Sequence, residues 1–235
     1  MNDQAPGQEL TIDRRAPTRR IELDEQSWVD LVDGFVVDPD AQFALVDAAA
    51  SWQQNEVLRY DRYVPEQRLS AMIRPDALAV FRQIGLHLQA TYRVPFVGPG
   101  VLKYRDGTDF QGLHSDREMR WLDDTLIAIV VLGARRPFVL RKRAAGAPPV
   151  DRTPAGAGAD DVVLLPGGGD LLVMGGAAQR DWLHGVPAAD ADTARLSLTW
   201  RWTSKRGRPD TNPGYYEGRQ YADGPRRPGY RSRRA

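Results

Sequence analysis

The residues of this chain that could bind a metal ion gather around one histidine and one carboxylate. His114 and Asp116 are two residues apart and follow the turn-forming segment Tyr104–Gly107. If the segment that begins at Gly112 is a strand, both side chains point to the same face, because side chains alternate along a strand. The pair could then reach one metal ion.

Such a site needs a third ligand, and the chain has two further histidines, His87 and His184. His184 lies before a strand-like segment that starts at Arg195, whereas His87 lies between two leucines of a predicted helix, where we expect a structural role. Two imidazoles and one carboxylate, with the opposite positions open, form the facial triad of non-haem Fe(II) oxygenases. We therefore expect His114, Asp116 and His184 to be the metal ligands. The chain has no cysteine, which excludes disulfides and thiolate ligands.

A strand with two arginines on one face predicts a second ligand. Residues Arg195–Thr203 alternate without a break, with arginine, serine and threonine on one face and leucine and tryptophan on the other, as in a half-buried strand. Arginines on an interior face require an anion, because buried charge must be paired. The planar guanidinium binds carboxylates through two hydrogen bonds, so Arg195 and Arg201 could hold the two ends of a dicarboxylate.

These motifs together resemble those of the AlkB-like Fe(II)/2-oxoglutarate dioxygenases, which remove alkyl groups from nucleic-acid bases. Tyr104–Gly107 is similar to the Tyr-Arg-x-Gly turn of the family, and His114–Glu118 to its His-x-Asp-x-acid motif. Gly169–Pro187 resembles the block around the second histidine, and Arg195–Arg201 the closing Arg-x-Asn-x-Thr-x-Arg. The order and combination of the four motifs make the resemblance specific.

The resemblance implies an oxidative dealkylase that needs Fe(II), 2-oxoglutarate and O2. The iron would be held by His114, Asp116 and His184. The co-substrate would be held by four residues: Tyr104, Arg195, Ser197 and Arg201. Oxidation of 2-oxoglutarate gives succinate and CO2, while the N-alkyl carbon is hydroxylated and leaves as an aldehyde. The implied partner is alkylated DNA or RNA.

Four residues are candidates for contact with the substrate, because aromatic and cationic side chains support base flipping and single-strand binding: Tyr60, Tyr63, Arg68 and Glu118. The first three lie in residues 53–75, a region that forms a lid over the base in AlkB-like enzymes, and Gln67–Ala71 resembles such a lid segment. The alternative for this region is an ordinary surface hairpin.

The chain departs from the family pattern at three positions. Leu102 and Ser197 stand where the family often has asparagines that help to hold the co-substrate, so we expect its binding to be weaker or differently arranged. Arg117 stands where close relatives tend to be acidic. A 2-oxoglutarate-dependent hydroxylase or demethylase of a protein, lipid or small molecule is therefore the alternative function. A non-catalytic cupin-like binding domain is a third, but it leaves two interior arginines without an anion.

The elements that would position these residues are two helices followed by short strands. Asp38 and Pro39 are typical of a helix start, and we predict helices from there to about Trp52 and over Asp76–Arg93. Later apolar or alternating runs, separated by Gly and Pro, indicate a sandwich or barrel. The predicted strands are Val101–Tyr104, Thr125–Leu132, Pro137–Arg141, Val162–Leu165, Leu171–Met174 and Arg195–Thr203. With the resemblance, we expect a mainly β (α+β) fold: a double-stranded β-helix, the jelly roll or cupin-like barrel, with two packing helices in its N-terminal part.

Length and charge indicate one dioxygenase domain over residues 21–204 with basic tails. Residues 201–235 carry ten Lys or Arg against three acids, a net +7, and residues 1–20 a net +1, which leaves −7 for the body. Basic tails suit contact with phosphates, or merely keep the protein in solution. We expect disorder in residues 1–20 and largely in 205–235, and a flexible insertion over 144–160. Because no run is long and apolar enough to span a membrane, we expect a cytoplasmic protein, a monomer, without membrane contact.

Overall fold

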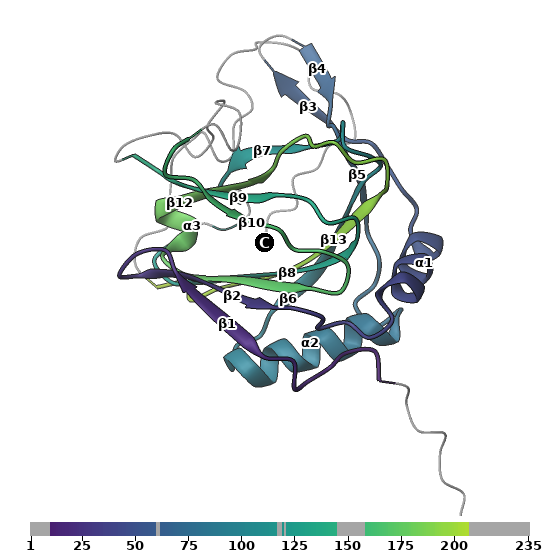
Figure 1. The fold of residues 1–235 in the computed structure, drawn as a ribbon, viewed down its shortest axis with the longest axis horizontal. Helices are drawn as coiled ribbons and strands as arrows, with labels where there is room; N and C mark the ends of the chain where they lie inside the picture. The colour runs from purple at the N-terminus through teal and green to yellow at the C-terminus, as the bar shows by residue number, and fades with distance from the viewer. Residues whose placement is uncertain (1–9, 60–61, 117–118, 120, 145–157, 207–235) are drawn as a thin grey trace, which may run out of the picture.

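Two β-sheets face each other in the computed structural model and enclose a common interior (Figure 1). The structure describes residues 10–59, 62–116, 119, 121–144 and 158–206. Within these residues the larger sheet has seven strands in the order β1-β2-β11-β8-β13-β6-β5, and the smaller has four in the order β10-β9-β12-β7. A separate hairpin, β3–β4, stands beyond β7 and β5. The fold is the predicted double-stranded β-helix.

The strands and helices follow the predicted order along the chain. Their bounds are β1 Thr18–Glu22, β2 Ser27–Val32, α1 Pro39–Ala49, β3 Glu56–Arg59, β4 Arg62–Pro65, β5 Leu69–Ala71, α2 Ala79–Tyr92, β6 Val97–Tyr104, β7 Gln111–His114, β8 Thr125–Gly133, β9 Phe138–Lys142, β10 Val162–Leu164, β11 Leu171–Gly176, α3 Ala178–Asp181, β12 Trp182–Val186 and β13 Arg195–Thr203. The last strand has the predicted bounds, and the other predicted strands are correct to within a few residues.

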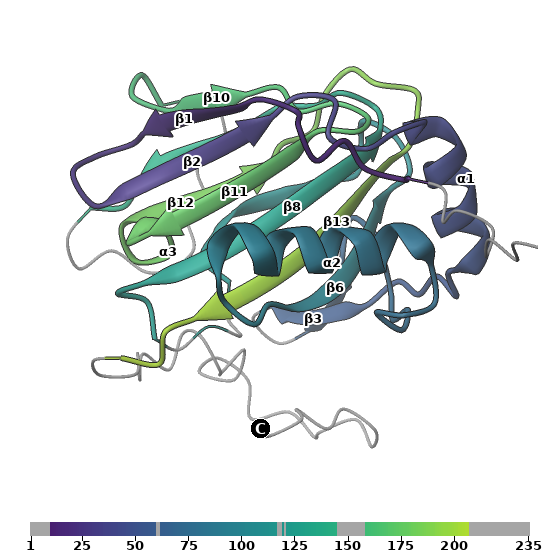
Figure 2. The ribbon, with the colours of Figure 1, turned by 90° about the horizontal axis from the view of Figure 1, so that it is seen from below.

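Two helices cover the outer face of the larger sheet, as predicted. The side chain of Asp38 accepts a hydrogen bond from the Ala41 N–H at 3.3 Å, and Pro39 is the first residue of α1, so the start of this helix is the predicted one. Helix α2 lies across the sheet and passes β8, β13 and β6 (Figure 2). It buries an apolar face that includes Phe81, Ile84 and Leu88. Both faces of the larger sheet are therefore shielded from water, the outer face by the helices and the inner face by the interior.

The alternation of side chains divides the molecule into an outer and an inner core. In β8, Ala128 and Val130 pack toward the helices, whereas Ile127, Ile129 and Val131 pack between the sheets. Strand β13 differs, because its helix-facing side is apolar but its inner side carries Arg195, Ser197, Thr199 and Arg201. This polar inner face is the place at which an interior ligand can be held.

Some expectations about the chain ends and loops need correction. Residues 10–20 were expected to be disordered, but Ile12 is buried and bridges to Val36, and β1 begins at Thr18. Most of the predicted insertion and tails lies in residues 1–9, 145–157 and 207–235, outside the described residues. None of the helices in the described ranges is long and apolar enough to cross a bilayer.

Candidate metal centre and co-substrate pocket

Three residues bring their ligand atoms together on the smaller sheet. His114 ends β7 and is the direct cross-strand partner of His184 on β12. Asp116 follows two residues later, and its Oδ1 lies 3.3 Å from Nε2 of His114 and 3.6 Å from Nε2 of His184. The ligand atoms all lie within 4.8 Å of one another. Two imidazoles and one carboxylate at this spacing fit a facial-triad iron site.

The local backbone differs from the one predicted for this pair. The strand that was expected to carry both His114 and Asp116 ends at His114. Asp116 therefore reaches the site from a loop, and the alternation of strand side chains does not explain its position. The pairing of β7 with β12 instead places one histidine from each strand side by side.

Hydrogen bonding orients the first histidine. Nδ1 of His114 lies 2.8 Å from the carbonyl oxygen of Gly112. Because a carbonyl only accepts hydrogen bonds, this contact suits a ring that carries a proton on Nδ1, and Nε2 of the same ring faces Asp116. A histidine that donates from one ring nitrogen to the backbone and offers the other to a metal is the usual arrangement at metal sites.

Burial keeps the second histidine neutral. The His184 ring stacks on Phe138 with 5.7 Å between centroids and 20° between planes, and the residue is only 6% exposed. Burial lowers the pKa of His184 and the neighbouring His114 acts in the same direction, although Asp116 opposes them. A neutral imidazole is the form that binds a metal.

Arg201 on β13 holds the carboxylate of the site from the opposite sheet. Its Nε donates to Oδ2 of Asp116 at 2.5 Å. Burial by itself would raise the pKa of Asp116, but the charge of the Arg201 guanidinium holds that pKa well below the usual range. The carboxylate is therefore ionised, as a metal ligand must be. This contact was not predicted, since Arg201 was expected beside the co-substrate, and that expectation stays a prediction.

Arg195 presents an unpaired cationic group to the interior. The residue is fully buried, its Nε lies 3.4 Å from Oγ of Ser197, and its Nη1 donates to the Arg136 carbonyl oxygen at 3.2 Å. Its Nη2 has no hydrogen-bond partner among the described residues. Burial, with a smaller contribution from the Arg136 guanidinium, lowers the pKa of Arg195 to about 10 against the opposing effect of Tyr104. A buried guanidinium with a free donor and no carboxylate partner fits an anionic ligand, as 2-oxoglutarate is.

Tyr104 lies at the end of β6, opposite Arg195 in the ladder between β6 and β13. Its phenol is buried, and burial raises the pKa of Tyr104 against the effect of three guanidiniums, those of Arg68, Arg195 and Arg136. The four residues therefore lie within electrostatic reach of one another. Together they make this end of the interior positive.

The turn after Tyr104 is held by direct backbone contact. The Gly107 N–H donates to the Ala191 carbonyl oxygen at 2.6 Å, and its own carbonyl accepts from Ala189 at 3.0 Å. A Cβ atom at Gly107 would lie 1.9 Å from the Ala189 carbonyl oxygen. Only glycine allows the two backbones to approach in this way, which explains the glycine of the Tyr-Arg-x-Gly motif in this chain.

Leu102 on β6 and Ser197 on β13, the two departures from the family pattern on these strands, lie next to each other. Leu102 and Ser197 are direct partners in the ladder between these strands. Ser197 is buried on the inner face, and Leu102 packs against the inner core. The wall beside Arg195 therefore offers one short hydroxyl and an apolar side chain.

The predicted substrate residues have different outcomes. Arg68 is the neighbour of Tyr104 described above and pairs with Glu66 at 3.1 Å. Tyr63 lies on β4 of the hairpin, where it is 39% exposed. Tyr60 and Glu118 lie outside the described residues. Phe110, which was not predicted, lies just before β7, is 40% exposed, and donates from its N–H to the Gln67 carbonyl oxygen at 2.9 Å.

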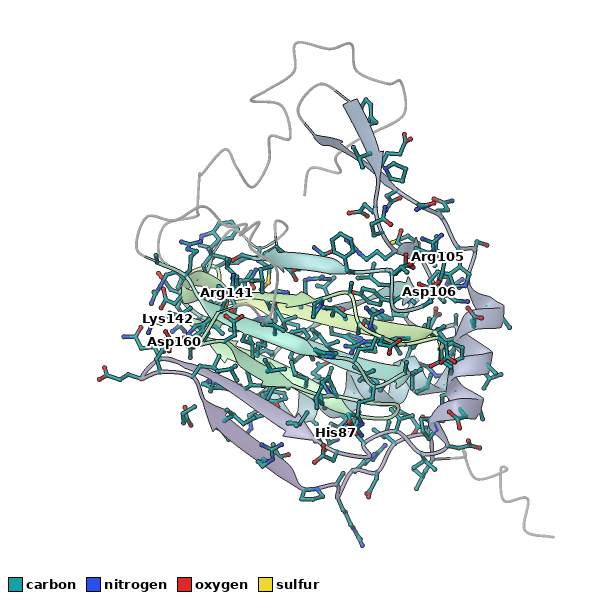
Figure 3. The ribbon with its side chains drawn as sticks, turned by 45° about the horizontal axis from the view of Figure 1, so that its top comes forward. His87, Arg105, Asp106, Arg141, Lys142 and Asp160 are labelled. Carbon is teal, nitrogen blue, oxygen red and sulfur yellow. The ribbon has the colours of Figure 1, made fainter. Side chains whose placement is uncertain are left out.

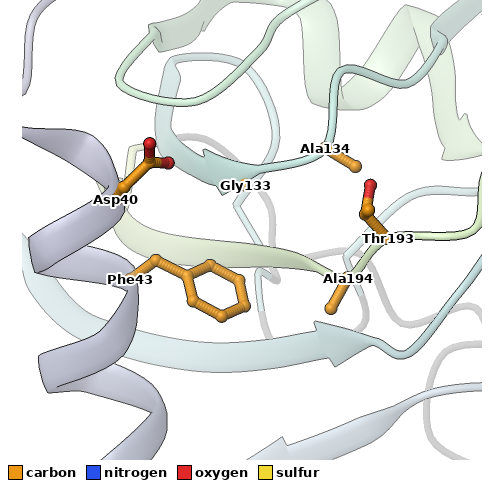
Figure 4. A pocket seen from close by; sticks show the side chains of 6 residues that line it. All are labelled: Asp40, Phe43, Gly133, Ala134, Thr193 and Ala194. Atoms are coloured by element: carbon orange, nitrogen blue, oxygen red, sulfur yellow. The ribbon is translucent and has the colours of Figure 1, made fainter.

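Two other regions are separate from this site. His87, labelled in Figure 3, packs its ring against Phe35 with 5.0 Å between centroids. This contact fits the predicted structural role of His87, which stays a prediction. A shallow pocket lies between the start of α1 and the end of β8 (Figure 4), lined by Asp40, Phe43, Gly133, Ala134, Thr193 and Ala194. It contains none of the metal-site residues, and its one charged residue is exposed.

Comparison with solved structures supports the fold. The structure of HygX from Streptomyces hygroscopicus with nickel, 2-oxoglutarate and hygromycin B bound matches with a TM-score of 0.53 at 14% identity, covering 74% of this chain and 81% of that chain. A prolyl hydroxylase from Trichoplax adhaerens, in complex with a hypoxia inducible factor peptide fragment, matches with a TM-score of 0.50 at 12% identity, covering 75% and 84%.

Comparison of sequences identifies the family. The model of the 2OG-Fe(II) oxygenase superfamily matches residues 41–206. The DNA oxidative demethylase ALKBH2 of Arabidopsis thaliana is 34% identical over 110 residues, which are 42% of this chain and 35% of the relative, so the match spans about a third of that protein. The alpha-ketoglutarate-dependent dioxygenase alkB homolog 3 of Mus musculus is 29% identical over 202 residues, 78% of this chain and 69% of the relative. The chain belongs to the 2OG-Fe(II) oxygenase superfamily, and its sequence is similar to AlkB-like members of that superfamily.

Proposed function

We propose that this dioxygenase removes alkyl groups oxidatively from N-alkylated bases of DNA or RNA. The observation that carries the proposal is the position of the hairpin and its flanking residues relative to the metal centre. The β3–β4 hairpin stands beyond β7, the strand that ends in His114, and the backbone contact of Phe110 with Gln67 ties the two regions together. In this proposal two exposed aromatic side chains, Tyr63 and Phe110, and the cationic Arg68 would line the approach to the iron.

These side chain types suit a nucleic-acid base. A base must leave its stack to reach a buried metal, and aromatic side chains replace the lost stacking. The similarity to a DNA oxidative demethylase and to an alkB homolog over most of this chain supports the same substrate class. The basic residues 201–235 would add attraction for phosphates.

The roles of the interior residues follow from their contacts. His114, Asp116 and His184 would hold Fe(II), and Arg195 would bind the distal carboxylate of 2-oxoglutarate through its free Nη2. The bound iron, 2-oxoglutarate and O2 supply an oxidant that hydroxylates the N-alkyl carbon, with succinate and CO2 as co-products. Buried apolar side chains beside the site, such as Phe138 against His184, would limit the access of water to this chemistry.

A second candidate keeps the chemistry and changes the acceptor to a protein side chain, lipid or small molecule. The cross-strand pair of Leu102 and Ser197 favours it, because the pocket wall lacks the two amides that the family pattern has. Because this departure concerns the co-substrate rather than the acceptor, the alternative acceptor is the second candidate.

Mass spectrometry of methylated oligonucleotides tests the proposal. Single- and double-stranded DNA and RNA with N-methylated bases would be incubated with the enzyme, Fe(II) and 2-oxoglutarate, with the Asp116→Ala variant and unmodified strands as controls. We expect a loss of 14 mass units from at least one methylated strand with the wild-type enzyme alone. Oxidation of a peptide, lipid or metabolite in a parallel screen, with every oligonucleotide unchanged, would favour the second candidate.

A further inference from the structure

Arg136 lies in the link between β8 and β9 and is fully buried, although this link is short and close to the surface. It is one of the two charged side chains in the described residues with no exposed surface; the other is Arg195. Its neighbour Arg135 has 61% of its side chain exposed. Sequence gives no reason to separate the two arginines, and neither belongs to the motifs named above.

The guanidinium of Arg136 is held by backbone carbonyls and not by a carboxylate. Nη1 donates to the Asp106 carbonyl oxygen at 2.9 Å, and Nη2 to those of Asp109 and Pro187, each at 2.7 Å. A fourth and longer contact joins Nη2 to the Gly107 carbonyl oxygen at 3.4 Å. The Arg136 side chain therefore holds together three segments: the turn after β6, the end of β12 and the β8–β9 link.

Two predicted co-substrate residues, Arg195 and Tyr104, both contact Arg136. The Arg136 carbonyl oxygen accepts the bond from Arg195 Nη1, and the guanidinium carbon of Arg136 lies 5.3 Å from the centroid of the Tyr104 ring. A ring face attracts a cation at this distance. Only Nη2 of Arg195 is then left free, and the contacts of Nη1 with Arg136 and of Nε with Ser197 together orient this nitrogen.

Burying two guanidiniums in one region costs folding free energy, unless an anionic ligand offsets their charge. Burial lowers the pKa of both arginines, and the carbonyl oxygens around Arg136 do not neutralise its charge. Methionine would fill a similar volume without that cost. The arrangement is explained if an anion is bound there.

We propose that Arg136 is a positioning residue of the 2-oxoglutarate pocket, which orients Arg195 and Tyr104 by fastening the turn after β6 to the β8–β9 link. This inference rests on the proposed role of Arg195 in binding the distal carboxylate. Arg136 itself need not touch the co-substrate, because it acts through the carbonyl that receives the Arg195 bond.

The test is the affinity of Fe(II)-loaded protein for 2-oxoglutarate without oxygen, measured by isothermal titration calorimetry. We expect Arg136→Met to weaken binding by about tenfold or more, as the misplacement of a charge-assisted hydrogen bond would. Arg136→Lys should weaken binding less, because an ammonium keeps the charge, but still measurably, because one ammonium cannot span four carbonyls. The matched control Arg135→Met should bind as the wild type does, and all three should retain Fe(II) affinity.

A double-mutant cycle separates positioning from general destabilisation. Because Arg136 is proposed to act partly through Arg195, Arg136→Met should weaken 2-oxoglutarate binding less in the Arg195→Met background than in the wild type. If the two substitutions reduce the affinity for 2-oxoglutarate independently, so that the fold-changes multiply, the inference is overturned. If Arg136→Met does not fold, wild-type affinity in Arg136→Lys would overturn it instead. Unchanged affinity in Arg195→Met would instead remove the proposed role of Arg195, and this inference with it.

Discussion

Arg201 on β13 and Asp116 on the loop after β7 face each other across the interior. Nε of Arg201 donates to Oδ2 at 2.5 Å, while Oδ1 lies 3.3 Å and 3.6 Å from Nε2 of His114 and His184. The larger sheet thus orients a metal ligand that belongs to a loop of the smaller sheet. A carboxylate held in this way is fixed before the metal arrives.

The first prediction concerns this contact. Arg201→Met should weaken Fe(II) binding by about 10- to 100-fold, the usual effect of losing a hydrogen-bond partner of a metal ligand. Arg201→Lys should lose less, because an ammonium retains the charge. The measurement is a competition titration with a metal-binding dye, with Arg195→Met as the control that should keep its metal affinity. Equal Fe(II) affinity in Arg201→Met and wild type would contradict this account of the contact.

The second prediction concerns the triad itself. We expect the wild-type protein to bind one Fe(II) per chain, and Asp116→Ala or His184→Ala to abolish 2-oxoglutarate turnover while the thermal unfolding midpoint stays close to that of the wild type. His87→Ala is the matched control, since this histidine packs on Phe35 away from the site. It should keep full turnover. Complete 2-oxoglutarate decarboxylation by either triad variant would end the metal assignment.

Much of the site was predictable from sequence, because the residues that carry chemistry have few alternatives. The chain has three histidines, so choosing the ligands required only the exclusion of His87. The alternation of Arg195–Thr203 predicted both the strand and its polar inner face, since a period of two has one structural meaning. The start of α1 was predictable because capping by Asp38 is a local effect.

What could not be predicted depends on contacts between distant segments. The pairing of His114 with His184 joins residues 70 positions apart, and no local pattern encodes that register. The bond between Arg201 and Asp116 crosses from one sheet to the other. The strand β1 was missed because its polar, arginine-rich sequence gains its order from pairing with β2 and not from its own periodicity.

The third prediction compares two residues of one strand. Arg195→Ala should raise the 2-oxoglutarate KM far more than Ser197→Ala does, because a charge-assisted pair contributes roughly 1.5 to 3 kcal/mol and a neutral hydrogen bond about 0.5 to 1.5 kcal/mol. Steady-state kinetics with succinate detection measures both. Equal effects of the two substitutions would remove Arg195 from the proposed role.

The fourth prediction concerns residues 219–235, which lie outside the described residues. This segment carries six arginines and one acid. We expect its deletion to leave 2-oxoglutarate turnover intact but to weaken binding to an alkylated oligonucleotide and to flatten the salt dependence. Each phosphate contact contributes about −0.9 to the log–log slope for duplex and about −0.7 for single strands, so several lost contacts change the slope by about two. Superimposable slopes of the full and shortened chains would show that the tail serves solubility alone.

The central claim is that oxidation of 2-oxoglutarate is coupled to removal of an alkyl group from a base. The most direct measurement quantifies succinate, released aldehyde and restored base in one reaction, with an oligonucleotide that carries a 13C-labelled N-methyl group. Oxidative dealkylation predicts labelled formaldehyde equal in amount to the restored base and matched by succinate, with none of the three formed by Asp116→Ala. Succinate formed at the same rate with and without methylated strands, and no labelled formaldehyde, would contradict it.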